Sequence, residues 1–456
     1  MSNTIAAIST APGIGGIGII RISGDECFYV LEKIFKQKNP QKIEEIKGYT
    51  IKFGNIIDEN KNIIDEVLVS YFKAPKSYTT ENMCEINSHG GVVIMNKILD
   101  LCIKNGAEIA EPGEFTKRAF LNGRMDLSQA EAVIDVINAK TDKEAKISLE
   151  QLEGNLSQKI TKIRKIIISI MADIEATIDY PEYDLEEVTN VRILNTLNEV
   201  EKLLISLENS FYNGKILREG IKVAIIGRPN AGKSSLLNVI LNEERAIVTD
   251  IEGTTRDTIE EYISIDGVPL KIIDTAGIRN ANDEVEKIGV EKAIEISKSS
   301  DIVIAIFDVS RELNEEDKKI LDLLKDKNAI ILLNKIDLKV SIDTNIFEKM
   351  DKPIINISTK TKEGIDELYN EISKMFKLKE IANDGETIVS NVRHKNIIIN
   401  SRKNLLKAKE TIENNLPIDI ISTYLKEIIE ELGKITGETV TEDVIAEIFS
   451  KFCLGK

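Results

Sequence analysis

The chain has 456 residues, enough for about three folding units of ordinary size. Its 76 acidic and 60 basic residues leave a net charge of −16, which argues against broad, non-specific attraction to a phosphate backbone, so any RNA contact must be local or assisted. No early stretch combines a basic start, an apolar core and a small-residue cleavage site, and no apolar run reaches about eighteen residues. We therefore expect a cytoplasmic protein with no membrane segment. The 4 cysteines lack the close pairs of zinc sites or small disulfide scaffolds, which predicts reduced thiols.

The N-terminal part of the chain has the pattern of a small α+β unit. From Thr4 to about Tyr71, short Ile- and Val-rich runs alternate with turn signals, and a Gly/Pro turn at residues 111–113 closes the unit. Between Ser128 and Ile178, apolar residues recur three or four apart amid Lys and Glu, which predicts long amphipathic helices. Helical periodicity continues over Val191–Phe211 and returns only after about Gly385.

Between these helical stretches, β-rich runs alternate with amphipathic helical segments, the pattern of a doubly wound α/β domain. The simplest architecture is an α/β domain inserted in a helical domain. We expect an N-terminal domain over residues 1–120, a discontinuous helical domain over 121–215 and 380–456, and the inserted domain over 216–379.

A phosphate-binding loop follows the apolar run Ile221–Ile226. Residues 227–234 read Gly-Arg-Pro-Asn-Ala-Gly-Lys-Ser and lead into a helical segment, which is the context of a P-loop. Backbone N–H groups at the start of that helix can surround phosphates, Lys233 supplies positive charge and Ser234 can ligate Mg²⁺. An incidental glycine-rich turn is the alternative, but the strand before it and the helix after it argue against that interpretation.

A second element of a nucleotide site ends the apolar strand Leu270–Ile273. Residues 274–277, Asp-Thr-Ala-Gly, place a carboxylate where it can hold the shell of the Mg²⁺ ion and a glycine near the γ-phosphate. Thr254 and Thr255 lie between the two elements and fit a first switch segment. Thr255 is the expected second protein ligand of Mg²⁺, since a switch threonine binds the ion only when the γ-phosphate is present.

Guanine selectivity is predicted by Asn334-Lys335-Ile336-Asp337, which follows the apolar strand Ala329–Leu333. Asp337 can accept from the N–H groups of guanine, and adenine lacks that donor pair, so a buried carboxylate left unpaired would reject it. Residues 358–360 fit the last base-contacting loop, and the order of these motifs predicts a GTPase. The expected GTP contacts are Asn230, Ala231, Gly232, Lys233, Ser234, Ser235, Thr249, Asp250, Ile251, Glu252, Gly253, Thr254, Thr255, Asp274, Thr275, Ala276, Gly277, Asn334, Lys335, Asp337, Ser358, Thr359 and Lys360.

Residues 13–18 match the dinucleotide-binding pattern G-x-G-x-x-G, which alone would indicate an oxidoreductase. We reject that interpretation, because Ile19–Ile22 has strand character where the dinucleotide motif needs a helix. A turn between strands is the expected structure.

The position after the Asp-to-Gly motif is occupied by Ile278, where familiar small GTPases carry a glutamine that orients water. An aliphatic side chain cannot do this, so another group must hold the nucleophile. Asp283, Glu284 and Glu286 are candidates, although acidic residues at a solvated helix start are an equally good explanation.

These motifs, with two further segments and the C-terminus, support a family resemblance. The segments are residues 11–24 and 112–123, and the C-terminus reads Phe-Cys-Leu-Gly-Lys over residues 452–456. Over essentially its full length the chain resembles the MnmE (TrmE) family, GTPases that help to modify the wobble uridine of certain tRNAs. The resemblance implies a homodimer and an N-terminal domain that binds 5-formyl- or 5,10-methylene-tetrahydrofolate.

Motif positions carried over from the family imply folate contacts at Arg21, Glu85, Arg124 and Lys456. The two arginines could pair with glutamate carboxylates of the folate, and Glu85 could accept from its ring. Surface charge is the alternative for all of them. Arg124 stands where some relatives have lysine, which keeps the charge but changes the hydrogen-bond geometry.

The resemblance also implies that potassium near the phosphates substitutes for an arginine finger when two GTPase domains meet. A cation over the bridging oxygens stabilises charge that develops in phosphoryl transfer. Its implied ligands are the side chain of Asn230 and groups of Thr249, Ile251 and Thr254, and the acid that positions water is Glu286. With the resemblance, the functional role of Glu286 becomes our prediction.

Cys453 lies near the folate site in the family and is needed there for tRNA modification, so we expect a catalytic role. A prenylation signal fits poorly because Gly455 and Lys456 follow it, and a buried structural cysteine stays an alternative. The resemblance further implies an MnmG-type flavoprotein partner in a heterotetramer, with glycine or ammonium as nitrogen donor. GTP hydrolysis would drive domain association and separation.

Two other classes remain as hypotheses. A ribosome-assembly or trafficking GTPase would share the central domain but should carry a basic RNA-binding appendage. A dinucleotide oxidoreductase would need the first glycine cluster to bind NAD.

Overall fold

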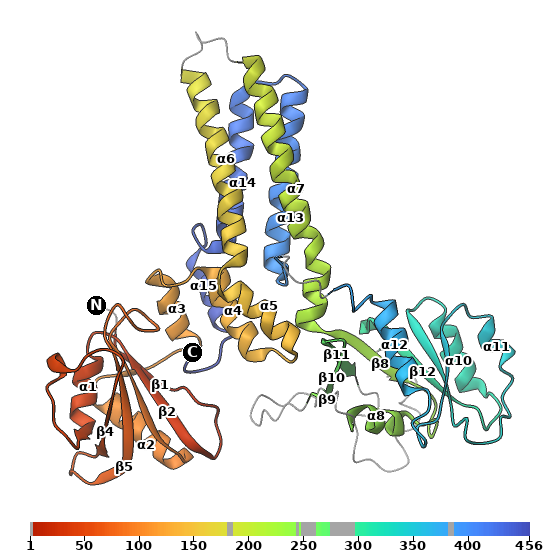
Figure 1. The fold of residues 1–456 in the computed structure, drawn as a ribbon, viewed down its shortest axis with the longest axis horizontal. Coiled ribbons are helices and arrows are strands. Elements are labelled where there is room, and N and C mark those ends of the chain that lie inside the picture. Colours follow the sequence, from red (N-terminus) through yellow and green to blue (C-terminus); the bar gives the residue numbers. More distant parts are fainter. Residues whose placement is uncertain (1–2, 180–185, 243–245, 248–260, 274–296, 382–386) are drawn as a thin grey trace.

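The computed structural model describes residues 3–179, 186–242, 246–247, 261–273, 297–381 and 387–456. A long helical bundle stands between an N-terminal α+β unit and an α/β unit (Figure 1). Helices from both sides of the α/β unit form the bundle, so the α/β unit is an insertion in the helical part of the chain. The predicted fold class, with a Ras-like P-loop unit inserted in a helical one, is confirmed. Within the described ranges, no helix is long and apolar enough to cross a membrane.

The N-terminal unit is built on a seven-stranded sheet in the order β3-β4-β5-β6-β2-β1-β7. Helices α1 (Cys27–Ile34) and α2 (Val92–Lys104) pack on one of its faces and bury an aliphatic core with it. The other face leaves Ile51, Phe53 and Leu68 exposed. The remaining elements are β1 (Ile5–Ile8), β2 (Gly15–Ser23), β3 (Phe35–Gln37), η1 (Ile43–Glu45), β4 (Thr50–Ile57), β5 (Ile63–Phe72), β6 (Met83–Gly90) and β7 (Glu108–Ile109).

The residues of the G-x-G-x-x-G pattern lie at the start of β2, which pairs with β1 and β6. Strand β2 continues to Ser23 where the dinucleotide motif needs a helix, so the rejection of that motif agrees with the structure. The predicted turn between strands is right only for Gly13 and Ile14, because residues 15–18 belong to β2.

The predicted helical stretch Ser128–Ile178 forms three helices, of 12, 11 and 25 residues, so only the last is long. The next helix, α7 (Glu186–Glu219), begins before and ends after the periodic stretch Val191–Phe211. The apolar stripes of α6, α7, α13 and α14 meet in one core, in which Ile160, Leu204 and Leu425 are fully buried. The helices are α3 (Glu114–Leu121), α4 (Leu127–Asn138), α5 (Asp142–Leu152), α6 (Asn155–Asp179), α7 (Glu186–Glu219), α13 (Val392–Glu413), α14 (Ile418–Thr436) and α15 (Glu442–Phe449).

The inserted unit has a sheet in the order β14-β13-β12-β8-β11-β10-β9, parallel from β14 to β11. Alternate residues of β8 face two separate cores, Val223 on one side and Ala224 on the other, so both faces are covered. This explains the unbroken apolar runs in the sequence. Its elements are β8 (Ile221–Ile226), α8 (Lys233–Leu241), β9 (Ala246–Ile247), β10 (Glu261–Ile265), β11 (Val268–Ile273), β12 (Ile302–Asp308), α10 (Glu315–Leu324), β13 (Ala329–Asn334), α11 (Asn345–Glu348), β14 (Ile354–Ile357) and α12 (Ile365–Met375).

The chain leaves and rejoins the bundle along α7. It passes from α7 to β8 through Gly220, whose φ of 75° suits glycine. On its return, the main-chain N–H of Val389 donates to Ser210 Oγ at 3.0 Å. A Cβ on Gly214 would lie 2.3 Å from the Val389 oxygen, so the two segments need this glycine to approach each other.

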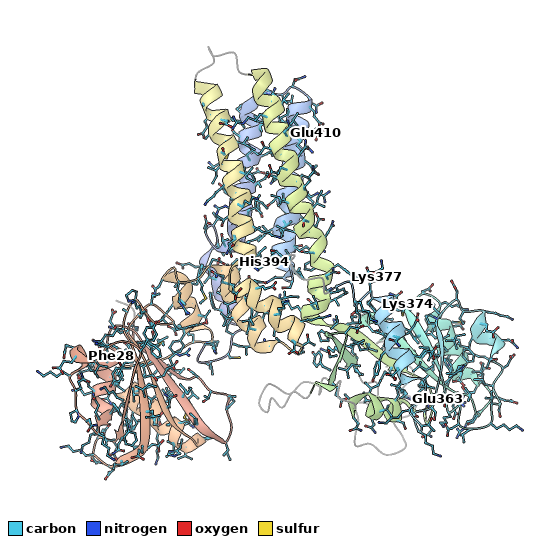
Figure 2. All side chains as sticks on the ribbon, in the orientation of Figure 1. Phe28, Glu363, Lys374, Lys377, His394 and Glu410 are labelled. Carbon is cyan, nitrogen blue, oxygen red and sulfur yellow. The ribbon has the colours of Figure 1, made fainter. Side chains whose placement is uncertain are left out.

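A buried carboxylate joins α4 to the start of α13. Glu131 is 5% exposed and accepts hydrogen bonds from Arg393 Nε at 3.0 Å and Nη2 at 2.8 Å, while His394 Nε2 lies 2.7 Å away. Burial alone would raise the pKa of Glu131, but His394 and then Arg393 outweigh it and lower the pKa to about 2. His394 lies at the base of the bundle (Figure 2).

The helical part also contacts the hairpin of β10 and β11. Lys143 donates to the main-chain oxygen of Asp266 at the hairpin turn, and the Lys140 ammonium lies 3.6 Å from the ring centre of Tyr262. The Asp266 carboxylate accepts a hydrogen bond from Ser373 of α12. The hairpin is therefore held between α5 and the helical layer of its own unit.

Glu144 beside this contact gives a testable pH dependence. Burial raises its pKa to about 7 against a usual value of 4.5. The folded protein keeps a proton that the unfolded chain releases, so stability falls as pH rises from 4.5 to about 7 and stays lower above that. We expect Glu144→Gln to raise the Tm by about 2–5 °C at pH 8 and by less at pH 5, measured by thermal unfolding. Glu150→Gln on the same helix is the control, and an equal rise at both pH values would contradict the prediction.

Candidate functional site

The phosphate loop lies between β8 and α8, as the sequence predicted. Lys233 is the first residue of α8, and its ammonium donates to the main-chain oxygens of Gly227 at 2.7 Å and Arg228 at 2.9 Å. Asn230 has a φ of 61° and Gly232 a φ of 111°, so the loop turns through two left-handed residues. Its backbone N–H groups and the N-terminus of α8 form a site for anions.

Residues 334–337, the predicted base-recognition loop, are linked to the phosphate loop by one buried side-chain amide. Asn334, the last residue of β13, is 0% exposed. Its Nδ2 donates to the main-chain oxygen of Ala231 at 2.8 Å, and its Oδ1 accepts from the N–H of Thr359 at 3.1 Å. This side chain therefore holds three predicted nucleotide-contacting loops together.

Asp337 is exposed and has a fixed orientation. Ser358 Oγ donates to Asp337 Oδ1 at 2.7 Å and accepts from the N–H of Thr361 at 3.2 Å. The carboxylate therefore keeps acceptor capacity for a ligand. Ser234 and Lys360 are also exposed, so both are accessible to a bound nucleotide.

Ser235, also a predicted contact, is exposed in the first turn of α8. The other residues predicted for the nucleotide site lie outside the described residues. These are Thr249, Asp250, Ile251, Glu252, Gly253, Thr254, Thr255, Asp274, Thr275, Ala276, Gly277, Asp283, Glu284 and Glu286.

A second site lies where the C-terminal tail meets the N-terminal sheet. Arg21 of β2 pairs with Glu85 of β6 at 2.8 Å and donates to the main-chain oxygen of Gly455 at 3.2 Å. Its guanidinium lies 5.3 Å from the ring centre of Tyr78 and 5.4 Å from that of Phe115. Neighbouring strands and aromatic packing thus fix both charged groups.

Arg124 comes to the same site from the segment before α4. Its guanidinium lies 4.6 Å from the ring centre of Tyr78 and donates to the main-chain oxygen of that residue at 2.8 Å. Arg21, Glu85 and Arg124 line one cavity of about 570 Å³. Burial, and then the charge of Arg21, lower the pKa of Lys456, whereas Glu85 opposes this. Three of the four predicted folate contacts therefore line one cavity, and Lys456 comes directly after Gly455, whose main-chain oxygen accepts from Arg21.

The tail is packed tightly enough to define this site. Phe449 and Phe452 are buried against α3 and α4, and the N–H of Gly113 donates to the Cys453 oxygen at 3.3 Å. A Cβ on Gly455, whose φ is 82°, would lie 2.4 Å from the main-chain oxygen of Ile8. Cys453 itself is exposed, which contradicts the alternative of a buried structural cysteine.

Comparison with known proteins covers both sites. A family model described as "GTP-binding protein TrmE N-terminus" matches residues 4–124, and one described as "MnmE helical domain" matches residues 127–453. This chain belongs to the MnmE family. The tRNA modification GTPase MnmE of Acetivibrio thermocellus is 51% identical across 100% of this chain and 99% of its own length. That of Clostridioides difficile is 51% identical across 100% of both chains.

Among solved structures, the G domain of the T. maritima FeoB iron transporter is 27% identical over 36% of this chain and 99% of that chain, with a TM-score of 0.25.

Sequence reasoning missed two parts of these MnmE-family sites. Tyr78, between the two arginines, carries no motif of its own. Asp308 ends β12 as the first charged residue after a fully buried strand, and its side chain contacts Lys335 of the base-recognition loop. A carboxylate at the carboxyl end of a parallel strand was the available signal for Asp308.

The approach of the two nucleotide loops depends on Gly232. A Cβ there would lie 2.1 Å from Asn334 Nδ2 at a φ of 111°. We expect Gly232→Ala to weaken GTP binding by about 10–100-fold, because it breaks the link between Asn334 and the phosphate loop. The measurement is a titration with a fluorescent GTP analogue. Gly15→Ala is the control and should bind normally, since its Cβ makes one ordinary contact, at 3.6 Å. Equal losses in both variants would contradict the prediction.

Proposed function

We propose that this chain is a potassium-dependent GTP hydrolase that acts, with an MnmG-type flavoprotein, on the wobble uridine of certain tRNAs. In that reaction a tetrahydrofolate one-carbon unit helps to build a carboxymethylaminomethyl or aminomethyl group on carbon five. The observation that carries the proposal is that one chain contains two sites. In the first, Asn334 links the base-recognition loop to the phosphate loop, and the second is a cavity lined by Arg21 and Arg124. The family membership is that of tRNA modification GTPases.

For the nucleotide, the proposal assigns phosphate binding to Lys233 and the N–H groups of the phosphate loop. Asp337, oriented by Ser358, would accept from the base N–H groups of guanine. Ser234 and Thr255 would hold magnesium, which neutralises charge on the phosphates when bound. The exposure of Ser234 and the hydroxyl chemistry of both residues fit that ion.

The proposal places potassium at Asn230, Thr249, Ile251 and Thr254, and gives Glu286 the role of positioning the attacking water. Potassium would stabilise charge on the bridging oxygens. Support comes from Asn230, whose main-chain oxygen is held by Lys335 while the residue itself is exposed. Its amide oxygen is the donor type that a hard cation prefers.

For the second site, we assign Arg21 and Arg124 to folate carboxylates, Glu85 to the folate ring, and Lys456 to the same ligand. A cavity of about 570 Å³ with cationic and aromatic walls has the size and chemistry for such a molecule. Exposure of Cys453 on the tail that borders this cavity supports a catalytic role for its thiol.

A homodimer is part of the proposal. The uncovered face of the N-terminal sheet exposes Ile51, Phe53 and Leu68, and a second copy would cover such apolar side chains. Hydrolysis would drive association and separation of the GTPase domains in a cytoplasmic heterotetramer with the flavoprotein. The proposed domains are 1–120 for folate and dimerisation, 121–215 with 380–456 for the helical domain, and 216–379 for GTP hydrolysis.

The potassium site predicts a salt-specific rate. Steady-state GTP hydrolysis should be at least about tenfold faster in potassium chloride than in sodium chloride at equal ionic strength. The difference should disappear in Asn230→Ala and persist in Asn242→Ala, an exposed asparagine at the end of α8. Equal wild-type rates in the two salts would remove the potassium site and reopen the ribosome-associated class of GTPase.

The folate site predicts a tail-dependent affinity. Arg21→Met should weaken binding of 5-formyl-tetrahydrofolate by about tenfold or more, measured by calorimetry, since it removes a charged hydrogen-bond donor. Gly455→Ala should also weaken it by displacing the tail from Ile8. Lys36→Met, an exposed cation on the same sheet, is the control. Unchanged affinity in Arg21→Met would contradict the assignment.

A further inference from the structure

Asp308 is a buried carboxylate next to the nucleotide loops that no motif accounts for. It ends β12, is 2% exposed, and its Oδ1 accepts from Ser310 N at 3.0 Å and Ser310 Oγ at 2.6 Å. Its Oδ2 accepts from Lys335 Nζ at 2.7 Å, with Arg311 Nε 3.6 Å away. Burial alone would raise the pKa of Asp308, but the hydrogen bonds from Lys335 and Ser310 lower it. The carboxylate is therefore charged and fully paired.

Lys335 links Asp308 to the phosphate loop. Its ammonium donates to the main-chain oxygen of Asn230 at 3.0 Å as well as to Asp308. Lys335 is left-handed, with a φ of 71°, a conformation that a lysine keeps only when its surroundings impose it. Asn230 has a φ of 61°, which asparagine adopts more readily.

A second link runs in parallel. The side chain of Asn334, one residue before Lys335, donates to the oxygen of Ala231, one residue after Asn230. Two consecutive side chains of the base-recognition loop thus hold two consecutive carbonyls of the phosphate loop. Asn334 is fixed by its own burial, whereas Lys335 is long, partly exposed and needs an anchor.

We propose that Asp308 is a positioning residue for GTP binding. It holds Lys335 against Asn230 and so sets the separation between the base-recognition loop and the phosphate loop. The inference rests on the proposed placement of guanine at Asp337 and of the phosphates at Lys233. Asp308 acts only through Lys335 and does not touch the nucleotide.

The test is a double-mutant cycle on affinity for a fluorescent GDP analogue. Asp308→Asn keeps the shape and the acceptor for Ser310 but removes the charge, and should weaken binding about tenfold. Lys335→Met should weaken it at least as much, and the double variant should be no weaker than Lys335→Met alone. Asp301→Asn, before the other end of β12, is the control, because its carboxylate accepts only from a main-chain N–H in the described structure.

Two outcomes would overturn the inference. The first is an unchanged affinity in Asp308→Asn. The second is that Asp308→Asn weakens binding by the same factor in the wild-type and in the Lys335→Met background, which would indicate a merely structural role. An unchanged affinity in Lys335→Met would instead remove the proposed nucleotide placement, so the two failures are distinguishable. Thermal unfolding without nucleotide confirms that each variant is folded. If Asp308→Asn does not fold, Ser310→Ala replaces it in the cycle, and additivity with Lys335→Met would again overturn the inference.

Discussion

The arrangement of this molecule depends on one buried carboxylate. Glu131 of α4 binds Arg393 and His394 at the start of α13, and Arg393 in turn donates to the main-chain oxygen of Lys434 near the end of α14. An ionised carboxylate in the interior is tolerated only with such partners, and removal of one partner leaves a costly unpaired charge. The cluster thereby ties together helices that come before and after the inserted unit.

Both candidate sites are connected to this anchor. α4 follows Arg124 in the chain, and α3, α4 and the tail residues Phe449 and Phe452 share one apolar cluster. In the other direction, Asp135 of α4 pairs at 2.8 Å with Arg218 in the last turn of α7, just before the phosphate-loop strand. The same short helix is therefore in contact with the tail at the cavity and with the segment that carries the nucleotide unit.

The sequence predicted much of this because some motifs are local. The phosphate loop, the strand before it and the helix after it are contiguous, so residue order alone places Lys233. Only the family resemblance could predict that four charged residues from distant segments meet, because no local pattern marks such residues as neighbours. These residues are Arg21, Glu85, Arg124 and Lys456. The Glu131 cluster was missed for the same reason, since Arg393 lies 262 residues from Glu131. Thr255 and Glu286 remain predictions, since they lie outside the described residues.

The insertion between α7 and α13 sets an order for biosynthesis. α6 and α7 emerge from the ribosome with their apolar stripes uncovered, and α13 and α14 follow only after the whole α/β unit, roughly ten to thirty seconds later at ordinary elongation rates. Within that interval the α/β unit can fold, and its exit segment packs back through Ile388 and Val389 toward α7. A folded insertion shortens the flexible loop that the bundle must close, which lowers the entropy cost of bringing α13 and α14 onto α6 and α7.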